Sequence, residues 1–289
     1  MSRNKSYFSL ASTFSVLLSI ALLVSAAHAA KNNSVTDTLS PEQVVEKNAA
    51  ARGGLKAWLA LQSMTMKGSM DAGKIKPAAK QGQEGSKQLV ENGRRTKPVK
   101  EEEGKIVELP FVLEIQRPHK MRLEIEYNGD TAVQVFDGVN GWKLRPFLGR
   151  REVETYTPDE MKTAQQQQDM EGPLMDYAAK GNKLVLEGID QVDGKDAYKL
   201  SLTLKDGEVR HIWVDAKTFL DVKLDGTRKL NGKPRTVSTY FRSFKTVDGL
   251  KIPDLIETSV EGVGGSEKIK IEHIALNAKL DAKRFTKPD

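Results

Sequence analysis

The 289-residue sequence contains no cysteine. This absence excludes disulfides, catalytic thiols, cysteine-ligated metals and the acylated cysteine of a membrane lipoprotein. Long hydrophobic runs are also missing. The apolar run Phe14 to Val24 covers only about half of a bilayer core at roughly 1.5 Å per residue. We therefore expect no membrane anchor and a soluble mature protein.

Residue patterns that carry chemistry are scarce as well. The three histidines beyond the N-terminal leader, His119, His211 and His273, are far apart and lack the spacing of a metal site. We expect them at strand edges or on a wet sheet face. The sequence has no GxSxG elbow and no P-loop. Asp215 ends a predicted strand, which favours a turn carboxylate over a catalytic one. We therefore predict no enzyme, no metal site and no cofactor.

The excess of positive charge is small. The chain has 45 basic and 39 acidic residues and a net charge of +6, which falls to +4 when the two basic residues of the leader are removed. Since no block of six Lys or Arg residues occurs, the pattern gives little support to nucleic-acid binding. It fits attraction to an anionic membrane surface better.

What is present begins with a secretory leader. Arg3 and Lys5 precede the apolar run, and Ala27-His28-Ala29 supplies small residues where a signal peptidase reads the chain. We expect a signal peptide, residues 1–29, cleaved near Ala29-Ala30, and a periplasmic mature protein. The remaining residues, 30–289, are enough for one all-β domain or two small ones, and we favour a single domain.

Two short helices are predicted before the first strand. Ser40-Pro41-Glu42-Gln43 is typical of an N-cap followed by proline in the first turn, and helical spacing continues toward Gly53-Gly54. A further turn or two, Leu55 to Leu61, brings in Trp58. From Met64 the apolar period changes to two, as in a half-buried strand.

Residues 71–105 break this rhythm. They are rich in Lys, Gln, Glu and Gly and contain few large apolar side chains. We predict an exposed, mobile insertion in the domain. A solvated loop is the simpler interpretation, and a basic arm that grips a partner is the alternative.

Alternating apolar residues then resume in short runs bounded by turn residues. The predicted strands are residues 107–115, 121–127, 131–136, 141–144, 183–189, 197–204, 209–215, 220–230, 235–246, 250–260 and 267–276. Thr157-Pro158-Asp159-Glu160 opens a helical segment that Gly172-Pro173 divides into two short helices and Gly181 ends. Eleven or twelve antiparallel strands with short helices predict a mainly β, α+β fold, a single large curved sheet or incomplete barrel.

A curved sheet with one apolar face must bury that face or use it. The predicted helical segment could cover it with Met161, Met170, Leu174 and Met175, and methionine repacks around varied apolar shapes at little cost. An ordinary helix over an ordinary core explains these residues equally well. Secretion and the lack of catalytic groups favour a carrier with a soft lid. The predicted cargo-binding residues are Leu113, Ile115, Leu123, Ile125, Val133, Val135, Trp142, Met161, Leu174, Met175, Leu202, Ile212 and Val214, a set that depends on strand register.

Four short motifs follow one another along the chain. They are ARGGL at Ala51 to Leu55 with Trp58 after it, Ile115-Gln116-Arg117-Pro118 before Met121-Arg122, Phe136-Asp137-Gly138 before Gly141-Trp142, and Leu280 to Phe285. In this order the chain resembles the LolA/LolB-like periplasmic lipoprotein carriers, in particular the outer-membrane lipoprotein-sorting proteins. The resemblance implies an open half-barrel of about eleven antiparallel strands capped by lid helices. It also implies an apolar cavity that receives the acyl chains of lipoproteins.

The resemblance gives Arg117 a role as a lid clasp. In carriers of this type, the arginine of the Arg-Pro motif hydrogen-bonds backbone carbonyls of the lid and holds the empty cavity shut. Pro118 biases the preceding residues toward extended geometry, so Arg117 is expected at a strand end. Carbonyls left unpaired at a helix C-terminus, near Ala178 to Gly181, are the expected acceptors.

The sequence thus predicts a monomeric periplasmic carrier of lipid-modified cargo. The cargo is a lipoprotein's acyl chains or a lipid, such as a hopanoid-like molecule. An inner-membrane donor complex and an outer-membrane acceptor are the expected partners. The alternative is a lipid-sensing regulatory protein that binds a membrane partner through the same fold, although such sensors typically add a second domain for which this chain lacks room. A periplasmic hydrolase would need a catalytic constellation that the sequence lacks.

Overall fold

The computed structural model of the chain describes residues 39–75, 105–146, 149–166, 169–230 and 233–289. The predicted signal peptide and residues 76–104 of the predicted insertion lie outside the described residues. The ends of that insertion are different from what we expected. Residues 71–75 and Lys105 belong to two paired strands, in which Ile75 lies opposite Lys105.

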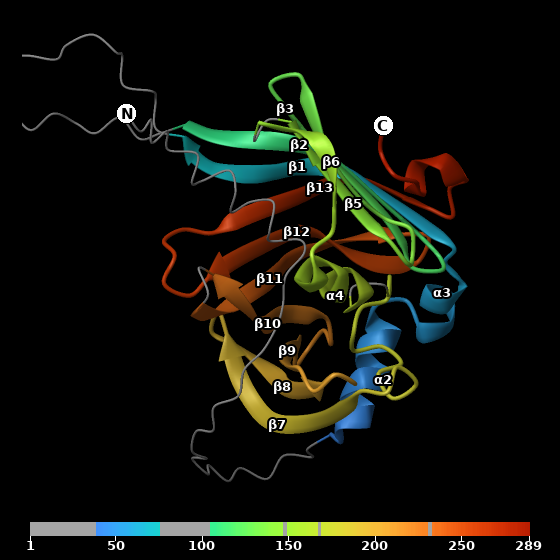
Figure 1. Cartoon of the computed structure of the whole chain (residues 1–289). Helices are drawn as coiled ribbons and strands as arrows, with labels where there is room; N and C mark the ends of the chain where they lie inside the picture. Colours follow the sequence, from blue (N-terminus) through green and yellow to red (C-terminus); the bar gives the residue numbers. More distant parts are fainter. Residues whose placement is uncertain (1–38, 76–104, 147–148, 167–168, 231–232) are drawn as a thin grey trace, which may run out of the picture.

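In the described part of the chain, thirteen strands form one curved antiparallel sheet (Figure 1). They are β1 Ser63–Ile75, β2 Lys105–Gln116, β3 Lys120–Tyr127, β4 Asp130–Phe136, β5 Gly141–Arg145, β6 Arg150–Thr155, β7 Lys183–Val192, β8 Lys195–Thr203, β9 Val209–Asp215, β10 Asp221–Leu230, β11 Lys233–Val247, β12 Leu250–Val260 and β13 Glu267–Leu276. The predicted mainly β, open half-barrel class is confirmed. β6 is the strand that the sequence pattern missed.

The order of strands in the sheet follows the chain except at one seam. The order is β6-β5-β4-β3-β2-β1-β13-β12-β11-β10-β9-β8-β7, so β1–β6 and β7–β13 are two meanders joined where β1 pairs with β13. β6 and β7 are therefore the two edges of the open sheet. The chain between them, residues 156–166 and 169–182, lies on the concave side (Figure 1). We call it the lid segment.

Helices α2 (Pro41–Ala51) and α3 (Leu55–Ala60) cover the concave side beside the lid segment. The predicted start of α2 is confirmed, because Ser40 and Gln43 form a reciprocal capping box at the first turn. The turn between the helices depends on Gly53. Its φ is +108°, and a Cβ there would stand 2.5 Å from the carbonyl oxygen of Gly249. This close approach holds the end of α2 against the sheet.

The lid segment begins with helix α4 (Pro158–Gln166), whose first turn is capped reciprocally by Thr157 and Glu160 as the sequence predicted. The second predicted helix, after Gly172-Pro173, is wrong, because residues 169–182 form turns. Positive φ angles at Gly172 (+83°) and Asp176 (+55°) interrupt any helical run. The side chains of Arg52 and of Lys180 within the lid segment donate to the carbonyls of Glu171 and Gly172, which a helix would have paired internally.

Apolar side chains of both meanders face the concave side. Under α2, the core contains Val44 and Val45 with Leu200, Leu202, Ile212 and Val214 of the sheet. Under α3 it contains Trp58 with Met64, Leu250 and Ile252. The opposite face of β2 and β3 carries the C-terminal turn η2 (Ala282–Phe285), held by Arg284 through Glu114 and Glu124. The main core and the cavity therefore lie on the concave side, and a smaller cluster of Val192, Ala197 and Trp213 lies on the opposite face.

Candidate functional site

An apolar cavity of about 220 Å³ lies between the middle of the sheet and the lid segment. Its sheet wall includes Met64, Met66, Leu224, Phe241, Ile252 and Ile256. Its roof includes Met170 and Leu174 of the lid segment, and Trp58 closes one side. Strands of both meanders contribute, so the cavity spans the seam between β1 and β13.

The cavity is suited to hydrocarbon. An engineered apolar cavity of about 150 Å³ already takes up benzene, whereas sites for drug-sized ligands are usually about 300–1,000 Å³. A volume of 220 Å³ therefore accommodates part of an acyl chain. A longer chain requires the lid segment to move away from the sheet.

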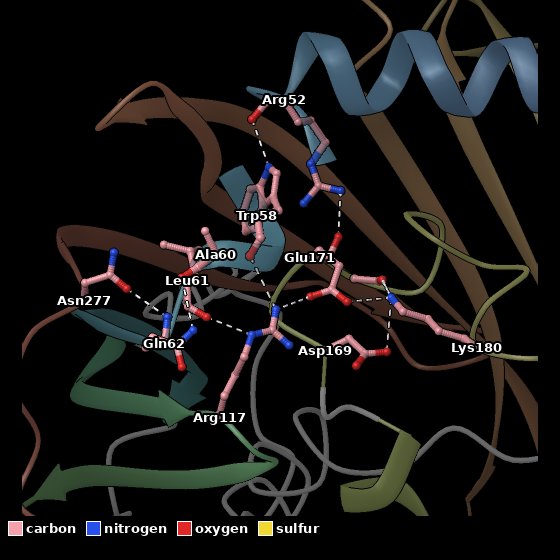
Figure 2. Close-up of polar contacts among 11 residues, drawn as sticks. Arg52, Trp58, Ala60, Leu61, Gln62, Arg117, Asp169, Glu171, Lys180 and Asn277 are labelled. Atoms are coloured by element: carbon pink, nitrogen blue, oxygen red, sulfur yellow. Dashed lines mark hydrogen bonds and ion pairs between the residues drawn. The ribbon is translucent and has the colours of Figure 1, made fainter. Parts of the chain in front are cut away.

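Arg117 joins the sheet to the lid segment at the end of β2, as the sequence predicted for its position. Its Nε donates to the carbonyl oxygen of Leu61 at 2.8 Å, and its Nη2 lies 3.4 Å from the carbonyl oxygen of Trp58 (Figure 2). The same nitrogen lies 2.7 Å from Oε2 of Glu171 in the lid segment. The acceptors expected near Ala178 to Gly181 are therefore wrong. The carbonyls at a helix end belong to α3, and the lid contributes a carboxylate.

Glu171 is the centre of a network that sequence reasoning missed. Its side chain is 2% exposed, and its second oxygen, Oε1, lies 2.9 Å from the ammonium of Lys180. Arg52 donates to its backbone carbonyl at 3.1 Å, so two arginines reach the same residue (Figure 2). Burial acts to raise the pKa of the Glu171 carboxyl. The hydrogen bonds from Lys180 and Arg117 outweigh burial and hold the pKa below its ordinary value.

Lys180 and Arg52 fix the backbone around Glu171. Lys180 donates to the carbonyl oxygen of Gly172 at 2.7 Å and lies 3.1 Å from the carboxylate of Asp169. Arg52 lies 3.2 Å from the carboxylate of Asp221, and its guanidinium stacks over Trp58 at 4.7 Å from the ring centre. These contacts satisfy carbonyls of the lid turns and close the cavity without a helix.

Asp221 is the one carboxylate in this region with a raised pKa. Burial raises the pKa of the Asp221 carboxyl. This effect exceeds the lowering of the pKa by the charge of Arg52 and by a hydrogen bond from Asn48 at 3.2 Å. Asp221 and Arg52 both border the cavity, so its mainly apolar wall includes this buried ion pair, together with Asp169 of the lid segment.

Compared by sequence, no family model and no curated protein matches this chain. Compared by structure, it is similar to a LolA superfamily protein from Nitrosomonas europaea, with 13% identity and a TM-score of 0.52 over 86% of this chain and 99% of that one. It is also similar to a DUF1329 family protein from Desulfovibrio piger, with 14% identity and a TM-score of 0.53 over 86% of this chain and 98% of that one. The chain has a LolA-like fold. The fold implied by the four sequence motifs is thereby confirmed.

Three of the predicted cargo-binding residues line the cavity of this LolA-like sheet: Ile115, Leu174 and Ile212. Others face the concave side but are packed into the core around it. Leu202 and Val214 pack under α2, Met175 packs with Trp58, and Met161 packs with Phe136. Leu113, Leu123 and Ile125 belong to the cluster between β1 and β4.

The predicted face is wrong for three candidate residues, Val133, Val135 and Trp142. Leu123 lies opposite Gln134, so Gln134 faces the concave side and its neighbours Val133 and Val135 face away. Val135 in turn lies opposite Trp142. We expected these three residues on the face of Leu123, but the turn between β3 and β4 shifts the alternation by one position.

The wall contributed by β10 to β13 was absent from the sequence prediction. Leu224, Phe241, Ile256 and Ile271 line the cavity although none was a candidate. β11 contains register shifts between Phe241 and Phe244, so counting by two along this strand assigns the wrong face. Glu171 could have been noticed as a single acid within an apolar run that also contains Gly172 and Pro173.

The remaining polar candidates have structural surroundings. His119 is exposed in the turn between β2 and β3, and His273 is exposed on β13. His211 is half-buried with Nε2 3.5 Å from the Glu187 carboxylate. Asp215 accepts hydrogen bonds from the backbone of Lys217 and Thr218, so its predicted turn role is confirmed. Among the described residues, no group of three or more His, Cys, Asp or Glu side chains could hold a metal ion. None of the described helices is long and apolar enough to cross a membrane.

Proposed function

We propose that this protein binds the acyl chain of a lipid or lipoprotein in the cavity under the lid segment and carries it through the periplasm toward the outer membrane. The observation that carries this proposal is the apolar cavity of about 220 Å³, roofed by the lid segment. Apolar side chains supply most of its wall, so burying a hydrocarbon chain there is favourable.

The free energy needed to open the lid segment is similar in size to the free energy gained by burying an acyl chain. Two charge-assisted contacts join Glu171 to residues outside the lid segment, its carboxylate with Arg117 and its backbone carbonyl with Arg52, and each contributes about 1.5–3 kcal/mol. Each buried methylene contributes about 0.8 kcal/mol, so roughly four to seven methylenes offset both contacts. An ordinary acyl chain can therefore open the lid segment, and the contacts close it again when the chain leaves. Arg117 acts as the clasp in this cycle.

A cavity-filling variant tests the proposal. Ile256 lines the cavity and is only half-buried, so Ile256→Trp directs a larger ring into free space. We expect this variant to abolish saturable binding of a fluorescent fatty acid while keeping its urea unfolding midpoint near that of the unmodified protein. Val185→Trp is the matched control, because Val185 is 58% exposed on edge strand β7.

The comparison of the two variants has two informative outcomes. Loss of binding in the Ile256 variant alone supports a ligand site in the cavity. Equal binding in both variants and in the unmodified protein overturns it.

The proposed periplasmic role rests on the predicted leader. It implies two partners, an inner-membrane donor complex and an outer-membrane acceptor. We expect the protein released by osmotic shock to begin near Ala30. N-terminal sequencing of that fraction checks this, and a retained Met1 would contradict it.

A further inference from the structure

Arg117 is a cationic site that exists independently of the lid segment. Its hydrogen bonds to the carbonyl oxygens of Leu61 and Trp58 fix the guanidinium against the C-terminal end of α3. It follows Gln116, the last residue of β2, and Ile115 of that strand lines the cavity. The site is therefore preorganised at the border of the apolar cavity.

The anion that fills this site belongs to the lid segment. Glu171 sits between Met170 and Gly172, both of which line the cavity. Its carboxylate is 2% exposed, whereas the Arg117 side chain is 22% exposed. Moving the lid segment away from the sheet would withdraw the carboxylate and leave the guanidinium beside an open apolar space.

We propose that Arg117 binds the anionic headgroup of the cargo and that Glu171 occupies this headgroup site in the closed form. The inference rests on the proposed function. It specifies the ligand as an anionic amphiphile, an acyl chain that ends in a carboxylate or a phosphate. A guanidinium pairs with either group through charge-assisted hydrogen bonds.

Replacement of Glu171 by the ligand's headgroup at Arg117 explains how the protein distinguishes an anionic amphiphile from an uncharged one. An anionic amphiphile replaces one carboxylate contact at Arg117 with another anionic contact. An uncharged amphiphile displaces Glu171 and returns no anion to the guanidinium. Glu171 therefore competes with the headgroup of the ligand as well as holding the lid.

The experiment compares amphiphiles that share one chain length. Dodecyl phosphate, dodecanoate and monododecanoyl glycerol are titrated calorimetrically into the mature full-length chain, each below its micelle concentration. Arg117→Gln removes the proposed headgroup site, and Glu171→Gln removes its internal competitor with little change of shape. Glu160→Gln is the matched control, because Glu160 is also a lid carboxylate in a pair with a buried lysine, Lys143, but does not line the cavity.

We expect the unmodified protein to bind the two anions more tightly than the glycerol ester. Arg117→Gln should lower this preference roughly tenfold, the equivalent of about one charge-assisted hydrogen bond. Glu171→Gln should tighten the binding of all three amphiphiles about equally, because each of them displaces the same carboxylate. Glu160→Gln should leave the preference and the three affinities unchanged. A preference confined to dodecyl phosphate assigns the site to phosphate, and an equal preference for dodecanoate assigns it to any terminal anion.

A preference for anions that survives Arg117→Gln would overturn the inference, because the headgroup would then bind elsewhere. Unchanged affinities in Glu171→Gln would also overturn it, because Glu171 would then not occupy the headgroup site. If the unmodified protein shows no preference for anions, the inference also fails, and this measurement does not depend on any variant folding. Absence of binding by all three amphiphiles would instead contradict the proposed function itself.

Discussion

Glu171 shows how one buried carboxylate can serve both as a closure and as a sensor of acid. Its oxygens contact cations from two sources, Arg117 at the end of β2 and Lys180 of the lid segment. These contacts keep the carboxyl ionised although it is almost fully buried. The closed lid segment is therefore coupled to the protonation state of a single side chain.

The first prediction concerns acid stability. A carboxyl whose folded pKa is depressed adds stability above its ordinary pKa of 4.5, and this stability is lost as the pH falls through the folded value. Glu171→Gln should therefore lower the free energy of unfolding by about 1–3 kcal/mol at neutral pH. The difference should shrink below the ordinary pKa. Urea unfolding of both proteins between neutral and acid pH measures this, and a difference that stays constant with pH would contradict it.

At the scale of elements, the turn between α2 and α3 positions two parts of the site. Arg52 ends α2, and its carbonyl accepts from the indole of Trp58 at 3.0 Å and from the backbone of Lys251 at 3.1 Å. Gly53 and Gly54 make the reversal with φ of +108° and +93°. The side chains of Arg52 and Trp58 reach the cavity because this turn holds them against β12.

The second prediction separates backbone strain from steric clash in that turn. Both glycines have a positive φ, so Gly53→Ala and Gly54→Ala each carry a conformational penalty of about 1–3 kcal/mol. An added Cβ at Gly53 also meets the carbonyl of Gly249, whereas the space at Gly54 is empty within 4 Å. We expect Gly53→Ala to be the less stable of the two by about 1 kcal/mol or more in urea unfolding. Equal losses would show that the contact with Gly249 is not limiting.

The comparison of sequence and structure is also clearest at this scale. The start of α2, the start of α4 and the position of Arg117 were predictable, because capping residues and prolines act on their immediate neighbours. β9, β12 and β13 were predicted with the bounds they have. The turns at residues 169–182 were not, because they depend on Arg52, which is distant in sequence. The face of Val133 and Val135 depends on a turn whose register the pattern does not encode.

At the scale of the whole molecule, the sheet is open and its two edges are connected through the lid segment. The cavity that this arrangement encloses is smaller than an ordinary acyl chain. Ligand size therefore decides whether the molecule must open.

The third prediction follows for a homologous series of fatty acids. Chains shorter than roughly four to seven methylenes cannot offset the contacts of Glu171 and should show no saturable binding. Beyond this length we expect the dissociation constant to fall about fourfold for each added methylene, until the opened cavity is filled. Titration calorimetry across the series measures the trend. A dissociation constant independent of chain length would exclude a buried chain.

The seam between β1 and β13 has a consequence for the order of folding. Met64 lies opposite Leu276, whereas the other strand pairs join neighbours along the chain. Pairing over so long a separation carries a large loop-closure entropy, so we expect the two meanders to form first and to dock at the seam last. Until then, β1 exposes an unpaired edge that can recruit other chains. Because both meanders supply the cavity wall, the site is completed at the final step, after the C-terminal strand has been synthesised.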